Sequence, residues 1–413
     1  MAIVVQKFGG TSVADSEKIR RAAERVAKAV DEGHQVVVVA SARGKQTDEL
    51  TADAFELNPN PPRRELDQLL STGEQQTVSL FAMALDAMGY DAISFTGGQI
   101  RMLTDSTHTK ARIKSIDAER IKKQLDNGKI VLVAGFQGID ENGNVTTLGR
   151  GGSDTSAMAI AAALGAKVCE IYTDVDGIYT ADPRIFHKAV KMDVISYDEM
   201  LEMASLGAGV LHSRAVEFGK KHNVIMHIRS SMNQNKGTVI SHEVSKMEDI
   251  VVSGATIQSD MAKIDLIGVD NKPGNAAKLF SDVAGAQVVV HDIVQTETNP
   301  EKATISFMVG SSDLKAAKAA VEKSSAKLNC ERIFVREDIA EVSIVGVGMR
   351  SHYGVADKMF GALAKAKVNV ESITTSEIRI SCVVASNDAE KALRVICTAF
   401  ELDKPAEQRR QSK

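Results

Sequence analysis

The feature that most constrains the fold is a regular alternation of short β-branched runs with alanine-rich helical stretches over the first 240 residues. Parallel strands that are buried on both faces are continuous apolar runs, and each needs a crossover helix to reach the next strand. The expected strands cover residues 3–5, 36–40, 92–95, 130–135, 168–172 and 224–229, and the clearest helices cover 16–32, 73–88 and 154–164. The pattern predicts a three-layer αβα domain with a mainly parallel sheet.

One segment interrupts this order. Residues 56–66 read ELNPNPPRREL and contain three prolines. Because proline lacks an N–H group and fixes its own φ angle, this composition predicts a stiffened loop rather than a regular element.

A different organisation begins after about residue 244, where the sequence matches itself at an offset of 80 residues. Each copy shows a strand, a glycine turn, a helix and a strand, and then a further strand, helix and strand, which favours a small α+β module. The segment 250–256 is strand-like but has no helix of its own, so we expect it to pair into the second module. The matched residues are Gly274, Ala276, Lys278, Phe280, Val288 and Val290 with Gly354, Ala356, Lys358, Phe360, Val368 and Val370.

Composition excludes several classes of function. The 413 residues are 44% hydrophobic and carry a formal net charge of -4, which gives no reason to expect nucleic acid or an anionic membrane as partner. No apolar run approaches a membrane span and no signal peptide pattern is present, so a cytoplasmic protein is expected. The four cysteines lack the spacing of a disulfide framework or a zinc site, and no metal-ligating cluster is predicted.

The stretch KFGGTS at residues 7–12 directly follows the first expected strand. Gly9 and Gly10 would let backbone amides approach a phosphate group closely, and Lys7 would add a positive charge. A plain tight turn is the alternative interpretation. The stretch matches neither GxxxxGK[ST] nor GxGxxG, so the common nucleotide-binding folds are not indicated.

Two further loops follow strands of the same predicted sheet. LGRGGSDTSA at 148–157 precedes an alanine-rich helix and offers Ser153 or Asp154 as its N-cap. YTDVDGIYTADPR at 172–184 contains three aspartates, two tyrosines and an arginine. Ligands of parallel sheets bind at the carboxyl ends of the strands, so we expect the polar loops to meet there.

Four segments together resemble the signature segments of the aspartate kinases, within the amino-acid kinase family. They are residues 7–12, STGE at 71–74, residues 149–155 and residues 173–184, and their order and spacing match as well. The two C-terminal modules resemble tandem ACT domains, the first inserted into the second. The resemblance implies a catalytic domain at 1–245, a linker and a strand of the second ACT domain at 246–264, and ACT domains at 265–338 and 339–413.

The resemblance implies transfer of the γ-phosphoryl group of MgATP to the β-carboxylate of L-aspartate. The product is 4-phospho-L-aspartate, the entry to lysine, threonine, methionine and isoleucine synthesis. A carboxylate acceptor is already ionised at neutral pH, so no general base is needed, and positioning and charge neutralisation carry the catalysis. Mg²⁺ is expected to be held largely by ATP phosphates and water.

The site residues are carried over from the family at matching positions. The catalytic residues are Lys7, Glu74 and Asp154. The ATP-binding residues are Lys7, Phe8, Gly9, Gly10, Ser41, Thr173, Asp174, Tyr179 and Arg184. The substrate-binding residues are Thr47, Glu74, Arg150, Gly151, Gly152, Ser153 and Asp154, with Glu74 on the α-ammonium and Arg150 on the α-carboxylate of aspartate.

The resemblance also implies feedback inhibition by lysine, threonine or both, and a homo-oligomer, dimer or tetramer, formed through the ACT domains. A glycine turn at a helix start offers free amides to an effector carboxylate. The residues expected to bind the effector are Asn271, Lys272, Pro273, Gly274, Asn275, Ala276, His291, Gln295, Val355, Ala356, Asn369, Val370, Ser376 and Glu377.

Three positions depart from the family pattern. Gly209 stands where many relatives have a lysine that contacts the nucleotide, Arg43 replaces a methionine beside the site, and His291 replaces an aspartate. His212 is interpreted as a packing or hydrogen-bonded histidine. Two alternative functions remain at this point: a carboxylate kinase of the glutamate kinase type, and an amino-acid sensor without turnover.

Overall fold

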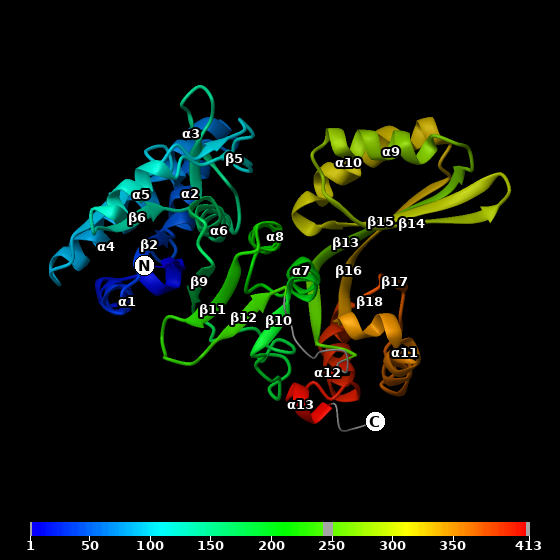
Figure 1. Cartoon of the computed structure of the whole chain (residues 1–413). Coiled ribbons are helices and arrows are strands. Elements are labelled where there is room, and N and C mark those ends of the chain that lie inside the picture. The colour runs from blue at the N-terminus through cyan, green and yellow to red at the C-terminus, as the bar shows by residue number, and fades with distance from the viewer. Residues whose placement is uncertain (1, 243–250, 410–413) are drawn as a thin grey trace. The chain divides into compact units, whose positions relative to one another are not determined.

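The computed structural model describes residues 2–242 and 251–409, and the chain divides into two compact units (Figure 1). Unit 1 holds residues 1–179, 191–205 and 209–247, and unit 2 holds 180–190, 206–208 and 248–413. None of the described helices is both long enough and apolar enough to cross a membrane.

Unit 1 is built on an eight-stranded sheet with the order β10-β12-β11-β9-β1-β2-β6-β3. All neighbouring strands are parallel except β11 and β12, so the mainly parallel sheet expected from the sequence is confirmed. The strands are β1 (Ile3–Phe8), β2 (Gln35–Ala40), β3 (Ala92–Phe95), β6 (Ile130–Ala134), β9 (Val168–Thr173), β10 (Val194–Ser196), β11 (Ile225–Ser230) and β12 (Thr238–Ser241).

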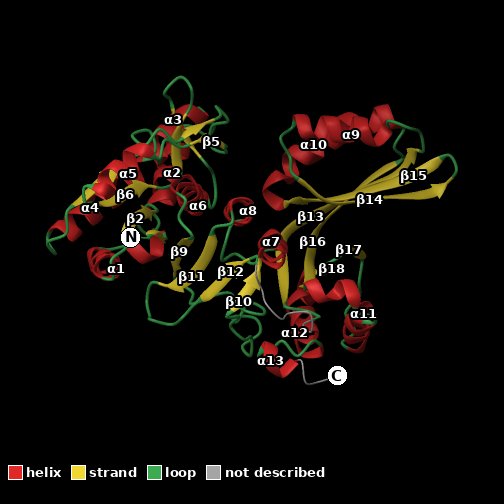
Figure 2. Ribbon diagram, in the orientation of Figure 1, coloured by secondary structure: helices red, strands yellow, loops and turns green. Residues whose placement is uncertain are grey.

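Helices cover both faces of this sheet (Figure 2). On one face α1 and α4 pack on Val36, Val38 and Phe8 in a common core. Side chains alternate along a strand, so Lys7 points to the opposite face, where α6 lies. The helices of unit 1 are α1 (Ser16–Asp31), α2 (Gln46–Leu57), α3 (Arg63–Leu70), α4 (Thr72–Asp86), α5 (Glu119–Asp126), α6 (Gly152–Leu164), α7 (Tyr197–Ser205) and α8 (Ser213–His222).

The loop predicted for residues 56–66 is shorter than expected. Helix α2 runs to Leu57 and α3 begins at Arg63, so only residues 58–62 between them are irregular. Pro62 is the N-cap residue of α3, a position where the missing N–H costs nothing, and the prolines therefore separate two helices. A small sheet with the order β5-β4-β7-β8 lies in the same unit; its strands are β4 (Leu103–Thr104), β5 (Ile113–Ser115), β7 (Gln137–Ile139) and β8 (Val145–Thr147).

Unit 2 is built on a six-stranded antiparallel sheet with the order β14-β15-β13-β16-β18-β17. Two long strands serve both modules: the start of β13 pairs with the end of β16, and from Met261 onward β13 also pairs with β15. The strands are β13 (Gly254–Asp270), β14 (Val290–Asn299), β15 (Lys302–Gly310), β16 (Arg332–Val345), β17 (Ser372–Thr375) and β18 (Arg379–Ala385). Of the segment predicted to pair at 250–256, residue 250 lies outside the described residues, and the strand begins at Gly254.

The internal repeat is visible in the helices of unit 2. Helix α9 (Asn275–Gly285) and α11 (Val355–Lys365) begin and end 80 residues apart, and the glycines before them have φ angles of 90° and 80°. Helices α10 (Leu314–Ser325) and α12 (Ala389–Ala399) complete the two modules, and α13 (Ala406–Arg409) follows. Each module has its own apolar core, and the second core includes Ala181 and Phe186 from the segment 180–190.

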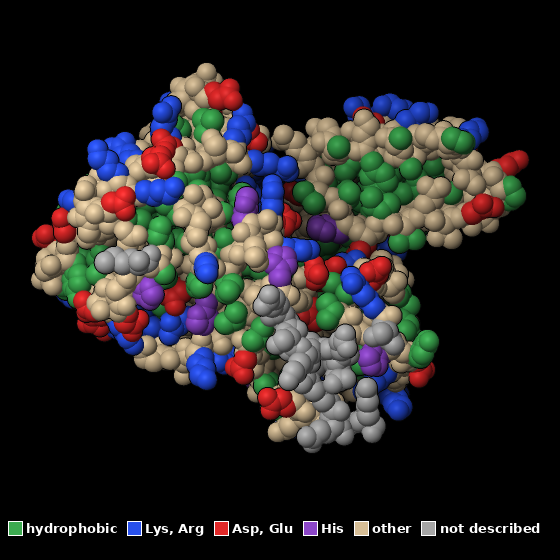
Figure 3. Space-filling model, in the orientation of Figure 1, with side chains coloured by type: hydrophobic (Ala, Val, Ile, Leu, Met, Phe, Trp, Pro, Cys, Tyr) green, Lys and Arg blue, Asp and Glu red, His purple; other side chains and the backbone are tan. Residues whose placement is uncertain are grey.

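The first module is open on one side. Figure 3 shows apolar side chains gathered between α10 and the sheet, where Ile264, Val321, Ile333 and Val335 line a cavity of about 380 Å³. Among the described residues, the stretch 332–338 of β16 pairs with β13 on one side and has no strand on the other, because β18 pairs with β16 only from Ile339 onward. This stretch therefore presents a free strand edge, which is a surface suited to pairing with another chain.

Helix α4 supplies a matched pair for testing the core of unit 1. Leu85 is fully buried, whereas Met83 on the same helix is 65% exposed. We expect Leu85→Ala to lower the free energy of unfolding by about 2–5 kcal/mol, because it removes buried methyl groups and leaves a cavity. Met83→Ala is expected to change it by less than about 0.5 kcal/mol. Urea unfolding followed by circular dichroism measures both, and equal effects would contradict the assigned burial.

Candidate active site

A cavity of about 300 Å³ lies in unit 1 at the carboxyl ends of β1 and β2. Five chain segments meet there: the end of β1 with its glycine turn, residues 41–47 after β2, the start of α4, Phe136 after β6, and the loop that leads into α6. The cavity is lined by Lys7, Gly10, Ser41, Ala42, Gly44, Thr47, Glu74, Phe136, Gly149, Arg150, Gly151, Gly152, Ser153 and Asp154. All three residues predicted to be catalytic, and all seven predicted to bind substrate, are therefore brought together.

Lys7 and Asp154 form an ion pair on one wall of this cavity. The Lys7 Nζ atom lies 2.6 Å from Asp154 Oδ1, and the two side chains are only 10% and 12% exposed. Lys7 comes from the end of β1 and Asp154 from the first turn of α6. The pair places a cation and the free amides of a helix start together, which is an arrangement that attracts an anion.

Glu74 lies in the first turn of α4 and is only 2% exposed. Its Oε1 atom accepts a hydrogen bond from the Ala42 backbone N–H at 3.0 Å, whereas its Oε2 atom has no hydrogen-bond partner among the described residues. Burial raises the pKa of Glu74 to about 8, against the smaller opposing effects of the Ala42 hydrogen bond and the Lys7 charge. An incoming cationic group would satisfy the unpaired oxygen.

The start of α6 differs from the sequence prediction. The N-cap residue is Gly151, with a φ angle of 68°, and neither Ser153 nor Asp154 caps the helix. The left-handed turn at Gly151 brings the backbone against His212, whose Cβ atom would lie 2.2 Å from any Cβ added at Gly151. Only glycine fits there, and the side chains of Ser153 and Asp154 are left to face the cavity.

His212 has the structural role expected from the sequence. Its ring accepts a hydrogen bond from the Arg214 backbone N–H at the start of α8. Burial and the neighbouring Arg214 charge lower the pKa of His212, so the ring is neutral at physiological pH. Arg214 in turn donates to the carbonyl groups of Leu148 and Ala111, which fixes the loop before α6.

The glycine turn after β1 is held by hydrogen bonds that the sequence did not reveal. The Gly9 N–H donates to the Tyr172 carbonyl at 3.0 Å, and Ser12 Oγ donates to Ser231 Oγ at 2.8 Å. Ser231 Oγ donates to the Thr173 carbonyl at 3.1 Å. Two serine hydroxyls thus connect the ends of β1, β9 and β11, and no sequence motif predicted a role for either of them.

The structure places only some of the predicted ATP-binding residues at the cavity. Lys7, Gly10 and Ser41 line the cavity, and Gly9 adjoins it in the same turn. The Phe8 ring is fully buried in the core, stacked on Tyr172, so only its backbone is free to contact a ligand.

The remaining nucleotide candidates lie after β9. Thr173 Oγ1 donates to Asp174 at 3.1 Å, and Tyr179 OH donates to Asp176 at 2.8 Å. Burial and this hydrogen bond raise the pKa of Tyr179 to about 12. Arg184 belongs to unit 2 and forms an ion pair with Asp182 at 2.7 Å.

Two of the departures from the family pattern can be located in unit 1. Arg43 donates to the Ala14 carbonyl at 3.3 Å, which ties its guanidinium to the turn before α1. Gly209 lies in unit 1 between α7 and α8. The cavity residues missing from the predicted site are Ala42 and Gly44 after β2, Phe136 after β6, and Gly149 in the loop before α6.

All residues predicted to bind an effector lie in unit 2. The Asn275 side chain donates to the Asp270 carbonyl, and Lys272 pairs with Asp270, so the turn before α9 is braced from within. The turn before α11 is in the other module, and Figure 1 shows α9 and α11 at different ends of the six-stranded sheet. Glu377 pairs with Arg350 at 2.9 Å.

Comparison with known proteins agrees with this geometry. A model of the amino acid kinase family matches residues 2–230, and an ACT domain model matches residues 342–400. Fold and cavity thus define an amino acid kinase with an ACT region. An aspartate kinase of Stutzerimonas stutzeri is 49% identical over 407 residues, covering 98% of this chain and 99% of that protein. The chain belongs to the aspartate kinases, so the family identified from the sequence is confirmed.

Solved structures support the same assignment. E. coli aspartokinase III in complex with aspartate and ADP, in the R state, aligns with a TM-score of 0.84 at 26% identity over 96% of this chain and 99% of that one. The same enzyme in complex with lysine and aspartate, in the T state, aligns with a TM-score of 0.74 at 25% identity over 96% and 99% of the two chains.

Two glycines of α6 test the importance of the turn into the cavity. Gly151 and Gly165 flank the helix and both have a φ angle of 68°, but an added Cβ meets His212 at Gly151 and open space at Gly165. We expect Gly165→Ala to cost about 1–2 kcal/mol of stability and to leave kcat/KM unchanged. Gly151→Ala is expected to lower kcat/KM by more than about 100-fold, because α6 must shift away from Lys7. Steady-state kinetics and thermal melting distinguish the two, and similar kinetics in both variants would contradict the assignment.

Proposed function

We propose that the chain transfers the γ-phosphoryl group of MgATP to the β-carboxylate of L-aspartate in the cavity of unit 1, giving 4-phospho-L-aspartate. The observation that carries this proposal is the meeting of the Lys7–Asp154 ion pair, the α6 helix start and the unpaired Glu74 oxygen in one small cavity. E. coli aspartokinase III, which has the same fold, binds aspartate and ADP.

Lys7 has the central catalytic role in this proposal. Its ammonium group offsets the negative charge that spreads over the transferred phosphoryl group, and the Gly10 amide adds a hydrogen bond, whereas the Gly9 N–H is already bonded to the Tyr172 carbonyl. Asp154 orients the ammonium group through the 2.6 Å contact. The acceptor carboxylate needs no general base, which fits a site that positions charges instead of removing a proton.

Glu74 and Arg150 would orient aspartate. The free Glu74 oxygen accepts the α-ammonium group, and Arg150 receives the α-carboxylate as a bidentate partner. Thr47, Gly151, Gly152 and Ser153, which line the same cavity, complete the proposed substrate contacts. Ala42 is added to the residues inferred from sequence, because its N–H holds the Glu74 carboxyl group in position.

ATP would extend from this cavity toward the end of β9. Ser41, Thr173, Asp174, Tyr179 and Arg184 are the proposed contacts of the nucleotide, with Phe8 contributing only its backbone. Mg²⁺ would be held mainly by the ATP phosphates and water, because it retains much of its hydration and prefers phosphate oxygens. Among the described residues, no three His, Cys, Asp or Glu side chains are grouped as a metal site.

Regulation would reside in the C-terminal half of the chain. We divide the sequence into a catalytic domain at 1–245, a linker and shared strand at 246–264, and ACT domains at 265–338 and 339–413. E. coli aspartokinase III binds lysine, and we propose that lysine, threonine or both inhibit this chain. The two glycine turns lie in different modules, so an effector that touches both requires a second chain. The free edge at 332–338 supports a homo-oligomer, dimer or tetramer, formed through the ACT domains.

A hydroxylamine trap for acyl phosphates tests the reaction. We expect product with ATP and aspartate and none with glutamate or without substrate. Lys7→Ala should lower kcat by more than about 100-fold, because a charge that acts on the transition state is lost. Lys18→Ala, which removes a surface lysine of α1 paired with Asp15, is the control and should keep normal kcat. Normal kcat in Lys7→Ala would contradict the phosphate role.

Proton release tests the role of Glu74. Since burial raises the pKa of Glu74 to about 8, the free enzyme holds a proton there at neutral pH. An ammonium ligand favours the charged carboxylate, so aspartate binding at about pH 6.5 should release close to one proton. Calorimetry in buffers of different ionisation enthalpy measures this number. Glu74→Gln should bind aspartate weakly and release none, and equal release in both proteins would contradict the role.

The same pKa shift predicts a pH dependence of stability. A carboxyl group whose pKa is raised in the folded state contributes stability below its ordinary pKa of 4.5, and loses that contribution as pH rises toward 8. The ligand-free enzyme should therefore become less stable between these values relative to Glu74→Gln. The urea midpoint of unfolding, measured against pH for both proteins, tests this expectation. A constant difference between the two midpoints across the range would exclude a raised pKa.

Feedback inhibition is tested by adding lysine and threonine, singly and together, to the kinase assay. We expect inhibition of the wild type and at least a tenfold weaker effect in Gly274→Asp, because the new acid occupies the helix start that would receive the effector carboxylate. Gly285→Asp, at the far end of α9 and also in open space, is the control. A wild type insensitive to both amino acids would exclude the regulatory proposal.

A further inference from the structure

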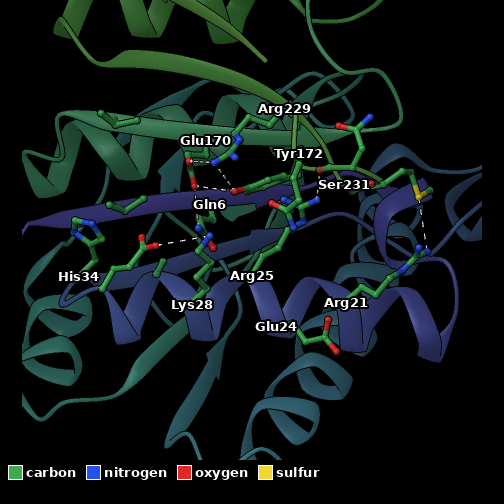
Figure 4. Close-up of a pocket in the computed structure, with 17 residues that line it drawn as sticks. Gln6, Arg21, Glu24, Arg25, Lys28, His34, Glu170, Tyr172, Arg229 and Ser231 are labelled. Carbon is green, nitrogen blue, oxygen red and sulfur yellow. Dashed lines mark hydrogen bonds and ion pairs between the residues drawn. The ribbon is translucent and has the colours of Figure 1, made fainter. Parts of the chain in front are cut away.

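A second and larger cavity lies in unit 1 on the face of β1 opposite Lys7. Its volume is about 640 Å³, and it lies between α1 and the strands β9 and β11 (Figure 4). It shares no lining residue with the candidate active site. Its lining includes four cationic side chains, Arg21, Arg25, Lys28 and Arg229, and three carboxylates, Glu24, Glu32 and Glu170.

Within the described residues, the carboxylates pair with only two of the four cations, Arg229 and Lys28. Glu170 is engaged from three sides, by Arg229 at 3.0 Å, Gln6 at 2.9 Å and Tyr172 OH at 3.0 Å. Figure 4 shows Glu24 pointing away from the strands. Glu32 lies 3.9 Å from Lys28 at the far end of α1.

Two arginines of α1 are left without a carboxylate partner among the described residues. Arg21 makes one long contact, 3.8 Å, to the Met232 sulfur, and its buried Nε atom has no hydrogen-bond partner. Arg25 stacks over the Tyr172 ring at 5.1 Å and donates to the Asn233 carbonyl. Since guanidinium groups favour bidentate contacts with phosphate or carboxylate, this cluster is prepared for an anion.

Two buried polar atoms that line the cavity also have no hydrogen-bond partner among the described residues. Gln6 is only 2% exposed, and its Oε1 atom has no hydrogen bond among the described residues, although its amide group donates to Glu170. The Arg229 Nε atom is buried and unpaired as well. Buried polar atoms are normally satisfied. The Arg229 Nε donor therefore marks a place where an anion completes the hydrogen bonding, whereas the Gln6 Oε1 acceptor calls for a donor such as water.

We propose that this cavity binds a compact polyanion, carrying phosphate or carboxylate groups, between α1 and β11. The wall opposite α1 includes Ser231 through Gln234, and Ser231 bonds to Ser12 of the glycine turn and to the Thr173 carbonyl. The site is thus separate from the active-site cavity but adjoins the segment that holds the phosphate-binding turn.

Calorimetric titration of the full-length protein at low ionic strength tests the proposal, with inorganic pyrophosphate and citrate as the two probes. Exposed surface charges bind such ions weakly, so a dissociation constant below about 1 mM is the criterion. Binding of pyrophosphate alone, citrate alone or both would support the site and identify the anionic group it prefers. Failure of both probes to bind would overturn it.

Two variants locate the binding. Arg21→Gln should weaken it at least tenfold, whereas Arg20→Gln, which removes the same charge from an exposed neighbour outside the cavity, should change it less than twofold. Equal effects would mean non-specific attraction and overturn the proposal. Lys7→Ala should bind the probe like the wild type, and loss of binding there would assign the anion to the active site instead. Thermal melting confirms that each variant is folded.

Discussion

The ion pair between Lys7 and Asp154 is the interaction on which the catalytic unit depends. Both side chains are nearly buried, and a buried charge is tolerated only when a partner stands close to it. Because Lys7 lies near the end of β1 and Asp154 in the first turn of α6, the pair links the helix start to the strand. The Gly151 turn, the cavity and the positions of Arg150 and Ser153 all follow from that placement.

Burial also sets the chemistry of Glu74. The carboxyl group is buried and accepts one backbone N–H, and its burial favours the neutral form. The cavity has a cation, Lys7, on one side and, on the other, the Glu74 carboxyl group, which has one oxygen unpaired among the described residues. Groups of opposite charge would distinguish the ammonium group of an amino acid from its carboxylate groups. In the proposed mechanism the substrate ammonium would complete the Glu74 hydrogen bonding, and Lys7 would act on the phosphoryl group.

The regulatory unit is built by sharing strands. Strands β13 and β16 each run through both modules, so neither module has a sheet of its own. The chain leaves unit 1 after Tyr179, adds residues 180–190 to the core of the second module, and returns at Lys191. The segment 180–190, which includes Arg184, is thus part of the ACT unit although helices and strands of unit 1 precede and follow it in the sequence.

Local patterns were sufficient for much of this molecule. Apolar runs predicted six of the eight strands of the large sheet, and the short strands β10 and β12 were missed. The 80-residue repeat predicted α9 and α11 with their glycine turns, because turn chemistry is a property of neighbouring residues. Motif resemblance brought Lys7, Glu74, Arg150 and Asp154 to one site, and the cavity contains all of them.

What the sequence did not determine depends on contacts between distant segments. The N-cap of α6 is Gly151 because His212 packs there, the Glu74 pKa is raised because α4 is buried, and the Ser12–Ser231 bond exists only where β1 and β11 ends meet. The sequence also predicted a loop from residue 56, whereas α2 continues to Leu57, because the prolines begin only at residue 59. The sequence by itself determined the elements and the family of this protein, whereas only the tertiary structure decided burial, and burial sets the charge state and free hydrogen-bonding groups of the site.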